Sequence, residues 1–224
     1  MLEMEGVNQS PMLFGALMAE AKKRRISALK TPEKKQELWN DYLRVILVRN
    51  PFERFVSGYT DKLVPEGRGY SYIYKPISIK LQSQFKSMRN NPSDRVLSQE
   101  HATFEDFVNY LIRTPDGGRD NHWKSYEWWC GPCEHGYDII MKMETLRDDV
   151  KYLWELLGIS EEHRKWFFPE VKPAVDRLET ERYFEKIPKN LSEALYDISK
   201  RDFNMFGYPK PKNGFAEVKF NVLR

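Results

Sequence analysis

Two short segments of the chain hold residue types suited to chemistry, and they point to different reactions. WCGPC, residues 129–133, contains both cysteines of the 224 residues in the C-x-x-C spacing of thiol–disulfide oxidoreductases. RNPFERFVS, residues 49–57, begins with an arginine after an apolar run and ends with a serine. An arginine fork, a hydroxyl and free backbone N–H groups at a helix N-terminus together suit a phosphate.

The flanks of WCGPC do not fit a redox site. A thioredoxin-type site follows a buried strand and opens a helix, whose N-terminus lowers the pKa of the first cysteine. Here residues 120–129 are too polar and irregular for a central strand, and residues 134–144 turn and then alternate like a strand. One C-x-x-C pair also supplies too few ligands for zinc. Two buried thiols or a short structural disulfide remain as interpretations of Cys130 and Cys133.

The flanks of residues 49–57 do fit a phosphate site. YLRVILV, residues 42–48, is a short apolar, β-branched run that predicts a buried strand, and Pro51 suits the first turn of a following helix. The apolar side chains after Pro51 recur at helical spacing. Strand, tight turn and helix is the geometry in which a phosphate meets a helix N-terminus. A structural role, in which Arg49 pairs with a carboxylate, is the alternative.

Capping and stop signals predict the remaining elements of one α/β domain. They are a helix from Pro32 capped by Thr31, a helix from Phe104 capped by Thr103 and Asp106, a strand over 137–143, a helix from Thr145 to Leu157 stopped by Gly158, and a helical stretch over 180–203 broken near Pro188. The apolar stripes are Phe104, Phe107, Val108 and Leu111 in one helix and Leu146, Val150, Leu153 and Leu157 in another. Residues 62–101 look irregular, and a connection of that length is more often functional than accidental.

The charge of the chain is concentrated in that connection. The net charge is only +3, which does not by itself indicate a duplex-binding protein. Residues 62–101 contain seven basic and three acidic residues. This excess favours an anionic partner, and a solvated surface loop is the alternative. No apolar run reaches the roughly 20 residues that a membrane span needs, and no signal peptide is recognisable.

VRNPFERFVSGY resembles the 3′-phosphate-binding motif of Golgi carbohydrate sulfotransferases. In the chondroitin/dermatan 4-O-sulfotransferase group this stretch reads approximately V-R-D/E-P-F-E-R-L-V-S-A-Y. The likeness continues in order through TFEDFVNYLI, NHW, WWCGPCEHGYDIIMKMETLRDDVKYLWELLG, RYFEKI and LYDISKRDFNMFGY, and covers about residues 31–208. Asn50 departs from the usual acidic residue.

The resemblance implies a P-loop-like α/β sulfotransferase fold over residues 1–224, with a central, mostly parallel sheet flanked by helices. The implied donor is 3′-phosphoadenosine 5′-phosphosulfate, used without a metal, and the implied acceptor is a glycosaminoglycan or a glycoprotein glycan in the Golgi lumen. Arg49 and Ser57 map onto the residues that hold the 3′-phosphate. The rest of the turn, namely Asn50, Pro51, Phe52, Glu53, Arg54, Phe55 and Val56, surrounds it.

The same resemblance assigns the other candidate residues. His122 in NHW matches a family histidine and is the expected base, since a histidine accepts a hydroxyl proton near neutral pH; a loop histidine bonded to backbone is the alternative. A C-x-P-C pair at this place in the family implies a Cys130–Cys133 disulfide. Trp123, Trp128 and Trp129 suit stacking on sugar faces, or else local packing. Asn8 and Asn190 lie in glycosylation sequons.

One family feature has no counterpart before Thr31. The family's 5′-phosphosulfate loop contains a Pro-Lys…Thr/Ser-x-Trp stretch, and its lysine stabilises charge on the transferred sulfate. We therefore expect an N-terminally truncated fold, a divergent enzyme, or a pseudoenzyme that binds nucleotide or glycan without turnover. Losing such a charge-stabilising group costs roughly 3–4 kcal/mol of transition-state stabilisation, so we expect the chain as printed to be poorly active. A thioredoxin-like oxidoreductase is the remote alternative.

Overall fold

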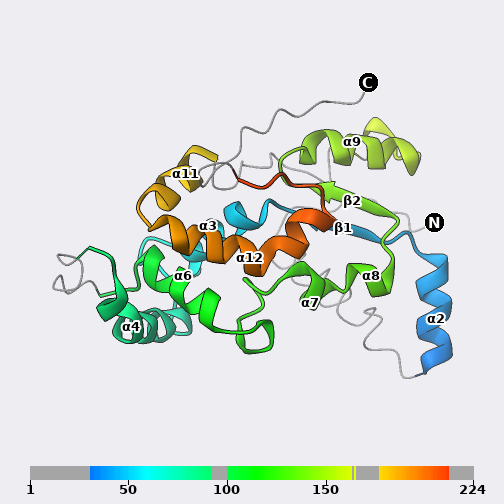
Figure 1. Ribbon diagram of the computed structural model, residues 1–224. Coiled ribbons are helices and arrows are strands. Elements are labelled where there is room, and N and C mark those ends of the chain that lie inside the picture. The colour runs from blue at the N-terminus through cyan, green and yellow to red at the C-terminus, as the bar shows by residue number, and fades with distance from the viewer. Residues whose placement is uncertain (1–30, 92–99, 163, 165–176, 212–224) are drawn as a thin grey trace. The chain divides into compact units, whose positions relative to one another are not determined.

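The computed structural model describes residues 31–91, 100–162, 164 and 177–211 (Figure 1). The chain divides into two compact units. Among the described residues, unit 1 holds 31–45 and 137–139, and unit 2 holds the rest. The single domain over residues 1–224 stays a prediction.

Unit 1 consists of helix α2, Pro32–Asp41, and the chain segments that lead into two strands. Its start at Pro32 agrees with the sequence. The Arg44 guanidinium donates to both carboxylate oxygens of Asp138 at 2.7 and 2.9 Å, and the Arg44 backbone N–H donates to the same carboxylate at 2.8 Å. These hydrogen bonds lower the pKa of Asp138 to about 2. The pair therefore ties together two segments that are 94 residues apart in sequence.

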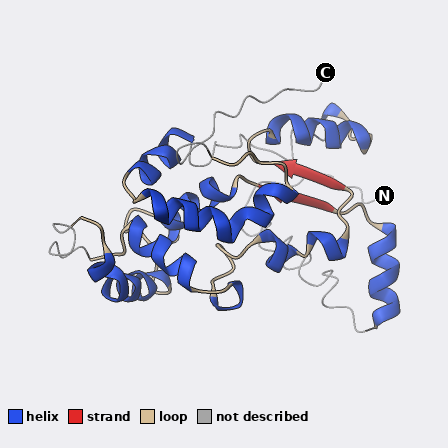
Figure 2. Ribbon diagram, viewed as in Figure 1, coloured by secondary structure: helices blue, strands red, loops and turns tan. Residues whose placement is uncertain are grey.

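Strands β1, Val45–Val48, and β2, Ile139–Lys142, form a two-stranded sheet within the described residues (Figure 2). The Arg44 carbonyl accepts from the Ile139 N–H at 3.1 Å, and the Val48 carbonyl accepts from the Met143 N–H at 2.8 Å. Partners advance in the same direction on both strands, so the pair is parallel. The long, mostly helical connection between the two strands is what a parallel pair requires.

Helices make up most of unit 2 (Figure 1). Their bounds are α3 Pro51–Lys62, α4 Tyr74–Phe85, η2 Lys86–Met88, α6 Phe104–Arg113, η3 Asp116–Gly118, α7 Tyr126–Cys130, α8 Pro132–His135, α9 Leu146–Leu156, α11 Arg177–Glu185 and α12 Lys189–Met205. Helix α12 packs against α3, α6 and α7, while α11 packs against α3 and α4 against α6.

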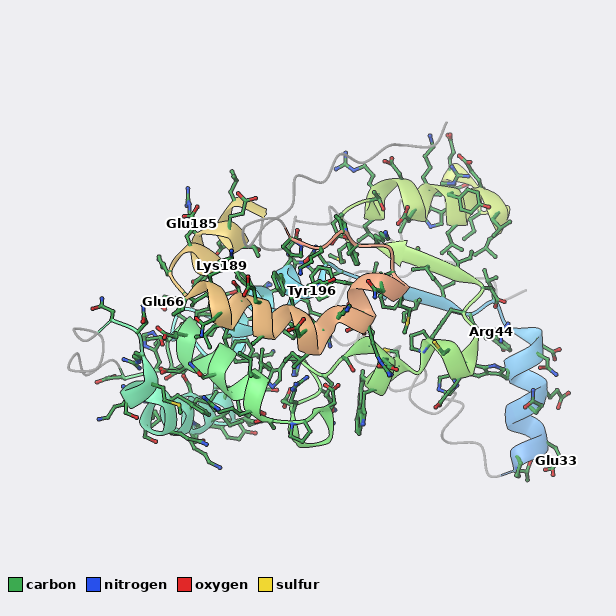
Figure 3. All side chains as sticks on the ribbon, viewed as in Figure 1. Glu33, Arg44, Glu66, Glu185, Lys189 and Tyr196 are labelled. Carbon is green, nitrogen blue, oxygen red and sulfur yellow. The ribbon has the colours of Figure 1, made fainter. Side chains whose placement is uncertain are left out.

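Aromatic side chains hold α3 against α11 and α12. Phe52 of α3 stacks on Phe184 of α11 at 4.4 Å between ring centroids and meets Phe203 of α12 edge-on at 5.2 Å. Tyr196 of α12, labelled in Figure 3, packs on the same Phe203 ring. Because Phe52 is the second residue of α3, this packing fixes the start of that helix and hence the turn before it.

Elements with strong local signals follow the prediction. Helix α3 begins at Pro51, and α6 carries a complete capping box between Thr103 and Asp106. The four apolar residues of the α6 stripe are buried. Pro188 separates α11 from α12 as expected. Helix α9 also forms after Thr145, although the Thr145 hydroxyl makes no capping bond and instead donates to the Asp149 carboxylate at 2.8 Å.

Two predictions of local structure, those for residues 62–101 and for the burial of β1, are wrong. Residues 62–101 are not irregular throughout, because α4 and η2 lie within them. Helix α4 buries only Leu81 and Phe85 among its large apolar residues and is held partly by Ser78. The Ser78 hydroxyl donates to the Leu63 carbonyl at 2.7 Å and accepts from the Ala102 N–H at 2.9 Å. The stretch before Cys130 forms no strand, as predicted, and it ends in helix α7, capped by Ser125. Strand β1 is not buried throughout, since Leu47 is exposed.

Candidate active site

Asn50, in the turn between β1 and α3, is the N-cap of α3. The Asn50 side-chain oxygen accepts from the Phe52 N–H at 3.0 Å and the Glu53 N–H at 3.4 Å, while the Asn50 N–H donates to Glu144 at 2.6 Å. The expectation of free backbone N–H groups for a phosphate is therefore wrong for Phe52 and Glu53. Asparagine is a strong N-cap, and its short side chain reaches these donors before a ligand does.

Arg49 is buried at the carboxyl end of β1, with 7% of its surface exposed. Its backbone N–H donates to the Tyr126 hydroxyl at 3.1 Å, and its Nε donates to the Glu53 carboxylate at 3.3 Å. The carboxylate pairing that the sequence left open is thus present. A paired arginine is also held in one orientation, which suits binding of a second anion.

An open cleft of ≈ 670 Å³ in unit 2 contains both ends of the predicted phosphate motif. Its lining residues are Leu47, Arg49, Arg54, Ser57, Gly58, Thr60, Asp61, Lys62, Glu66, Gly67, Arg68, His122, Tyr126 and Met143. Four of these are Arg or Lys and two are acidic, one of them Glu66, labelled in Figure 3. Arg49 follows β1 and Met143 follows β2, so the cleft lies at the carboxyl ends of parallel strands, where α/β proteins bind ligands. The excess of positive charge suits an anion.

The other residues of the 49–57 motif serve the fold instead. Four of them, Pro51, Phe52, Phe55 and Val56, are buried in the core of unit 2. Asn50 caps α3 and Glu53 pairs with Arg49. Of the nine predicted donor-binding residues, Arg49, Arg54 and Ser57 therefore line the cleft.

His122 lies in the same cleft, 65 residues after Ser57 in the sequence, and its side chain is half exposed. Its Nδ1 lies 2.6 Å from an Asp120 carboxylate oxygen and 3.0 Å from the Tyr74 hydroxyl. Burial raises the pKa of Asp120, but hydrogen bonds from His122 and Tyr74 outweigh it and lower that pKa overall. An ionised Asp120 places the ring proton on Nδ1 and so directs Nε2 to accept a proton. Asp120 and Tyr74 were missed in the sequence; the D-x-H spacing was the available signal.

Both cysteines are thiols in the structure, and they lie where α7 ends and α8 begins. Cys130 is the last residue of α7 and Cys133 lies in the four-residue α8, with Gly131 between them at φ +52°. Burial raises the pKa of the Cys130 thiol, against an opposing effect of Arg54. A thioredoxin-type cysteine has a lowered pKa at a helix N-terminus, so this geometry disfavours that function. The Cys130–Cys133 disulfide stays a prediction.

The predicted basic segment and tryptophans have mixed roles. Lys62 and Arg68 line the cleft, whereas Arg89 is fully buried in a two-bond ion pair with Asp106 and cannot meet a soluble anion. Trp123 is 1% exposed and packs on Phe107 at 5.3 Å, which makes it a core residue. Arg95 lies outside the described residues.

Comparison with known proteins identifies the family. Residues 13–209 match the model of the sulfotransferase family. The chain belongs to the sulfotransferase family. It is 32% identical to carbohydrate sulfotransferase 10 of Xenopus laevis over 197 residues, 84% of this chain and 53% of that protein. The human carbohydrate sulfotransferase 10 is 32% identical over the same length, 84% of this chain and 52% of its own. Mouse carbohydrate sulfotransferase 11 is 31% identical over 175 residues, 76% of this chain and 48% of that protein.

The chain spans about half the length of these relatives. No solved structure matches it significantly. The mixed helix and strand content with a parallel strand pair is consistent with the family, and the P-loop-like fold stays a prediction. Within the described ranges, no helix has the length and apolarity of a membrane span, and no three His, Cys, Asp or Glu side chains cluster as metal ligands would.

Proposed function

We propose that this chain forms part of a carbohydrate sulfotransferase that moves a sulfuryl group from 3′-phosphoadenosine 5′-phosphosulfate to a sugar hydroxyl. The observation that carries the proposal is the meeting of Arg49, Ser57 and His122 in one basic cleft at the carboxyl ends of two parallel strands. Arg49 and Ser57 would hold the donor's 3′-phosphate. Arg54, Lys62 and Arg68 add positive charge to the same walls.

The chemistry assigned to His122 is proton acceptance. In sulfuryl transfer the sugar oxygen forms a new S–O bond while the S–O bond to the donor's 5′-phosphate breaks, which releases adenosine 3′,5′-bisphosphate. The hydroxyl proton passes to Nε2 of His122, and the resulting imidazolium is stabilised by Asp120 at 2.6 Å. Tyr74 is a positioning residue, since its hydroxyl contacts both His122 and Asp120.

The acceptor class and the compartment are proposed by analogy with the relatives. The relatives are carbohydrate sulfotransferases, and we propose a chondroitin-like glycan in the Golgi lumen as acceptor. The positive excess of the cleft suits a uronate-bearing polymer. Of the two asparagines in glycosylation sequons, Asn190 is exposed in the first turn of α12, and Asn8 lies outside the described residues.

A nucleotide- or glycan-binding protein without turnover is the second candidate. The Arg49–Glu53 pair and the Asn50 cap are compatible with it, because neither contact requires turnover. Catalysis and binding alone predict the same nucleotide affinity and differ in turnover.

Calorimetric titration with adenosine 3′,5′-bisphosphate and with adenosine 5′-phosphate tests the nucleotide site. We expect the bisphosphate to bind more tightly than the monophosphate. Ser57→Ala should lower the affinity for the bisphosphate alone, so the difference between the two affinities becomes smaller. Ser83→Ala, an exposed serine of α4, is the matched control. Equal affinity for both nucleotides would contradict a 3′-phosphate site.

Sulfate transfer to desulfated chondroitin by the full-length protein tests the reaction. We expect His122→Ala to abolish turnover while nucleotide affinity is retained. Loss of nucleotide binding together with turnover would instead assign His122 to donor binding. Absence of transfer by the unmodified full-length protein that still binds nucleotide would favour the second candidate.

A further inference from the structure

Helix α7 presents two parallel indoles to the solvent. Trp128 is 52% exposed and Trp129 is 50% exposed. Their ring planes differ by 8°, and the ring centroids are 6.4 Å apart. Neighbouring residues on a helix normally point about 100° apart. The shared orientation of these two rings therefore needs a further cause.

Lys124 supplies that cause. Its side chain is buried, and its ammonium lies 4.3 Å from the ring centroid of Trp128 and 5.1 Å from that of Trp129. A cation placed this close to two ring faces is attracted to both of them. The contact restrains both indoles at once. The two tryptophan side chains therefore lose little conformational entropy when a ligand stacks on them.

The indole pair lies on the same five-residue helix as a residue of the cleft wall. Tyr126, the first residue of α7, lines the cleft, and the Arg54 guanidinium lies 4.4 Å from the centre of its ring. Arg54 also donates to the Lys124 carbonyl. The Asp202 carboxylate on α12 accepts from the backbone N–H groups of Tyr126 and Glu127 at 2.9 and 3.2 Å. Helix α7 is thus anchored at the end nearest the cleft.

We infer that Trp128 and Trp129 form a sugar-binding subsite that receives the glycan chain as it leaves the cleft. A pyranose ring has an apolar C–H face and a rim of hydroxyl groups. The two indoles provide flat apolar surfaces for that face, and the exposed Glu127–Arg201 ion pair provides polar groups beside them. Two parallel rings with centroids 6.4 Å apart offer a longer surface than one ring, so we expect the subsite to take an oligosaccharide. The identity of this ligand as the acceptor rests on the proposed function.

Calorimetric titration of the 224-residue chain with a desulfated chondroitin hexasaccharide tests the subsite without requiring turnover. We expect Trp128→Ala and Trp129→Ala each to weaken hexasaccharide binding about tenfold. Trp154→Ala on α9 is the matched control, because Trp154 also lies near a cation, Arg164, but does not line the cleft. Unchanged hexasaccharide affinity in both α7 variants would overturn the inference.

Two further measurements keep the test independent of folding and of the proposed function. In the wild-type chain labelled with nitrogen-15, the indole N–H signals of Trp128 and Trp129 should shift on addition of the hexasaccharide and that of Trp154 should not. Phe variants of Trp128 and Trp129 identify these signals, and shifts confined to other tryptophans would overturn the subsite. Adenosine 3′,5′-bisphosphate is titrated separately. Failure of that nucleotide to bind contradicts the proposed function and leaves the hexasaccharide result to decide the subsite.

Discussion

The turn at residues 49–57 and the WCGPC segment at 129–133 both resemble active-site motifs, and the structure gives them different roles. The first lies at the carboxyl end of β1 and contributes Arg49, Arg54 and Ser57 to a basic cleft. The second ends one short helix and begins another, with a cysteine whose pKa is raised by burial. The function of a motif therefore depends on the secondary-structure element that precedes it and on whether its side chains line a cleft.

The two regions are also linked. The Tyr126 hydroxyl, at the start of the helix that carries Cys130, accepts the Arg49 backbone N–H at 3.1 Å. Asp202 of α12 holds that helix in turn. Tyr126 of α7, three residues before WCGPC, therefore supports the turn between β1 and α3. Four experiments test this division of roles.

Removing the Arg49 side chain should have the largest effect. Arg49→Ala is expected to raise the dissociation constant for adenosine 3′,5′-bisphosphate about 100-fold, since a fixed guanidinium is lost from the proposed 3′-phosphate site. Calorimetry measures this change. Arg147→Ala, an exposed arginine of α9, is the control and should bind normally. If Arg49→Ala binds adenosine 3′,5′-bisphosphate with wild-type affinity, Arg49 pairs with Glu53 and does not bind the nucleotide.

Removing one hydroxyl tests the link between the regions. Tyr126→Phe leaves the buried Arg49 N–H without its partner and should lower the free energy of unfolding by about 1–2 kcal/mol, with weaker nucleotide binding as well. Urea denaturation and calorimetry report the two effects. The exposed Tyr152→Phe should change neither. If Tyr126→Phe matches the wild type in both, α7 does not support the turn.

Removing the cap tests the turn by itself. Asn50→Ala should cost about 1 kcal/mol of stability, because the N–H groups of Phe52 and Glu53 lose their acceptor. Asn50→Asp keeps an acceptor at this position and should lose less. Equal losses in the two variants by urea denaturation would show that the hydrogen bonds from Asn50 contribute little.

Blocking the cysteines should have the smallest effect. In the reduced Cys133→Ser variant, iodoacetamide should modify Cys130 with a pH midpoint above the ordinary thiol pKa of about 8.5, since burial disfavours the thiolate. The pH dependence of the alkylation rate gives this midpoint. Cys130→Ser should retain nucleotide affinity, and the wild type should not reduce insulin. A midpoint below 7, or insulin reduction, would restore the redox hypothesis.

The sequence by itself determined the elements whose signals lie within one or two helical turns. Pro51 before an apolar stripe predicted α3, the pair Thr103 and Asp106 predicted α6, and Pro188 predicted the break between α11 and α12, whereas the Asn50 cap was seen only in the structure. Each signal is local because a cap or a proline acts on backbone groups a few residues away. The family likeness likewise predicted Arg49, Ser57 and His122 as site residues, and all three line the cleft, while their roles stay a prediction.

Tertiary structure alone decided which of these residues meet and what each contacts. Helix α4 is held partly by the hydrogen bonds of Ser78 to Leu63 and Ala102, and no pattern in the sequence of α4 predicts these two bonds. The Arg49–Tyr126 bond joins residues 77 apart in sequence, and His122 reaches the cleft only because α3 and the 120–126 segment pack together. Such contacts form after the chain has closed long loops, so they depend on the packing of the whole unit and leave no periodic trace in the sequence.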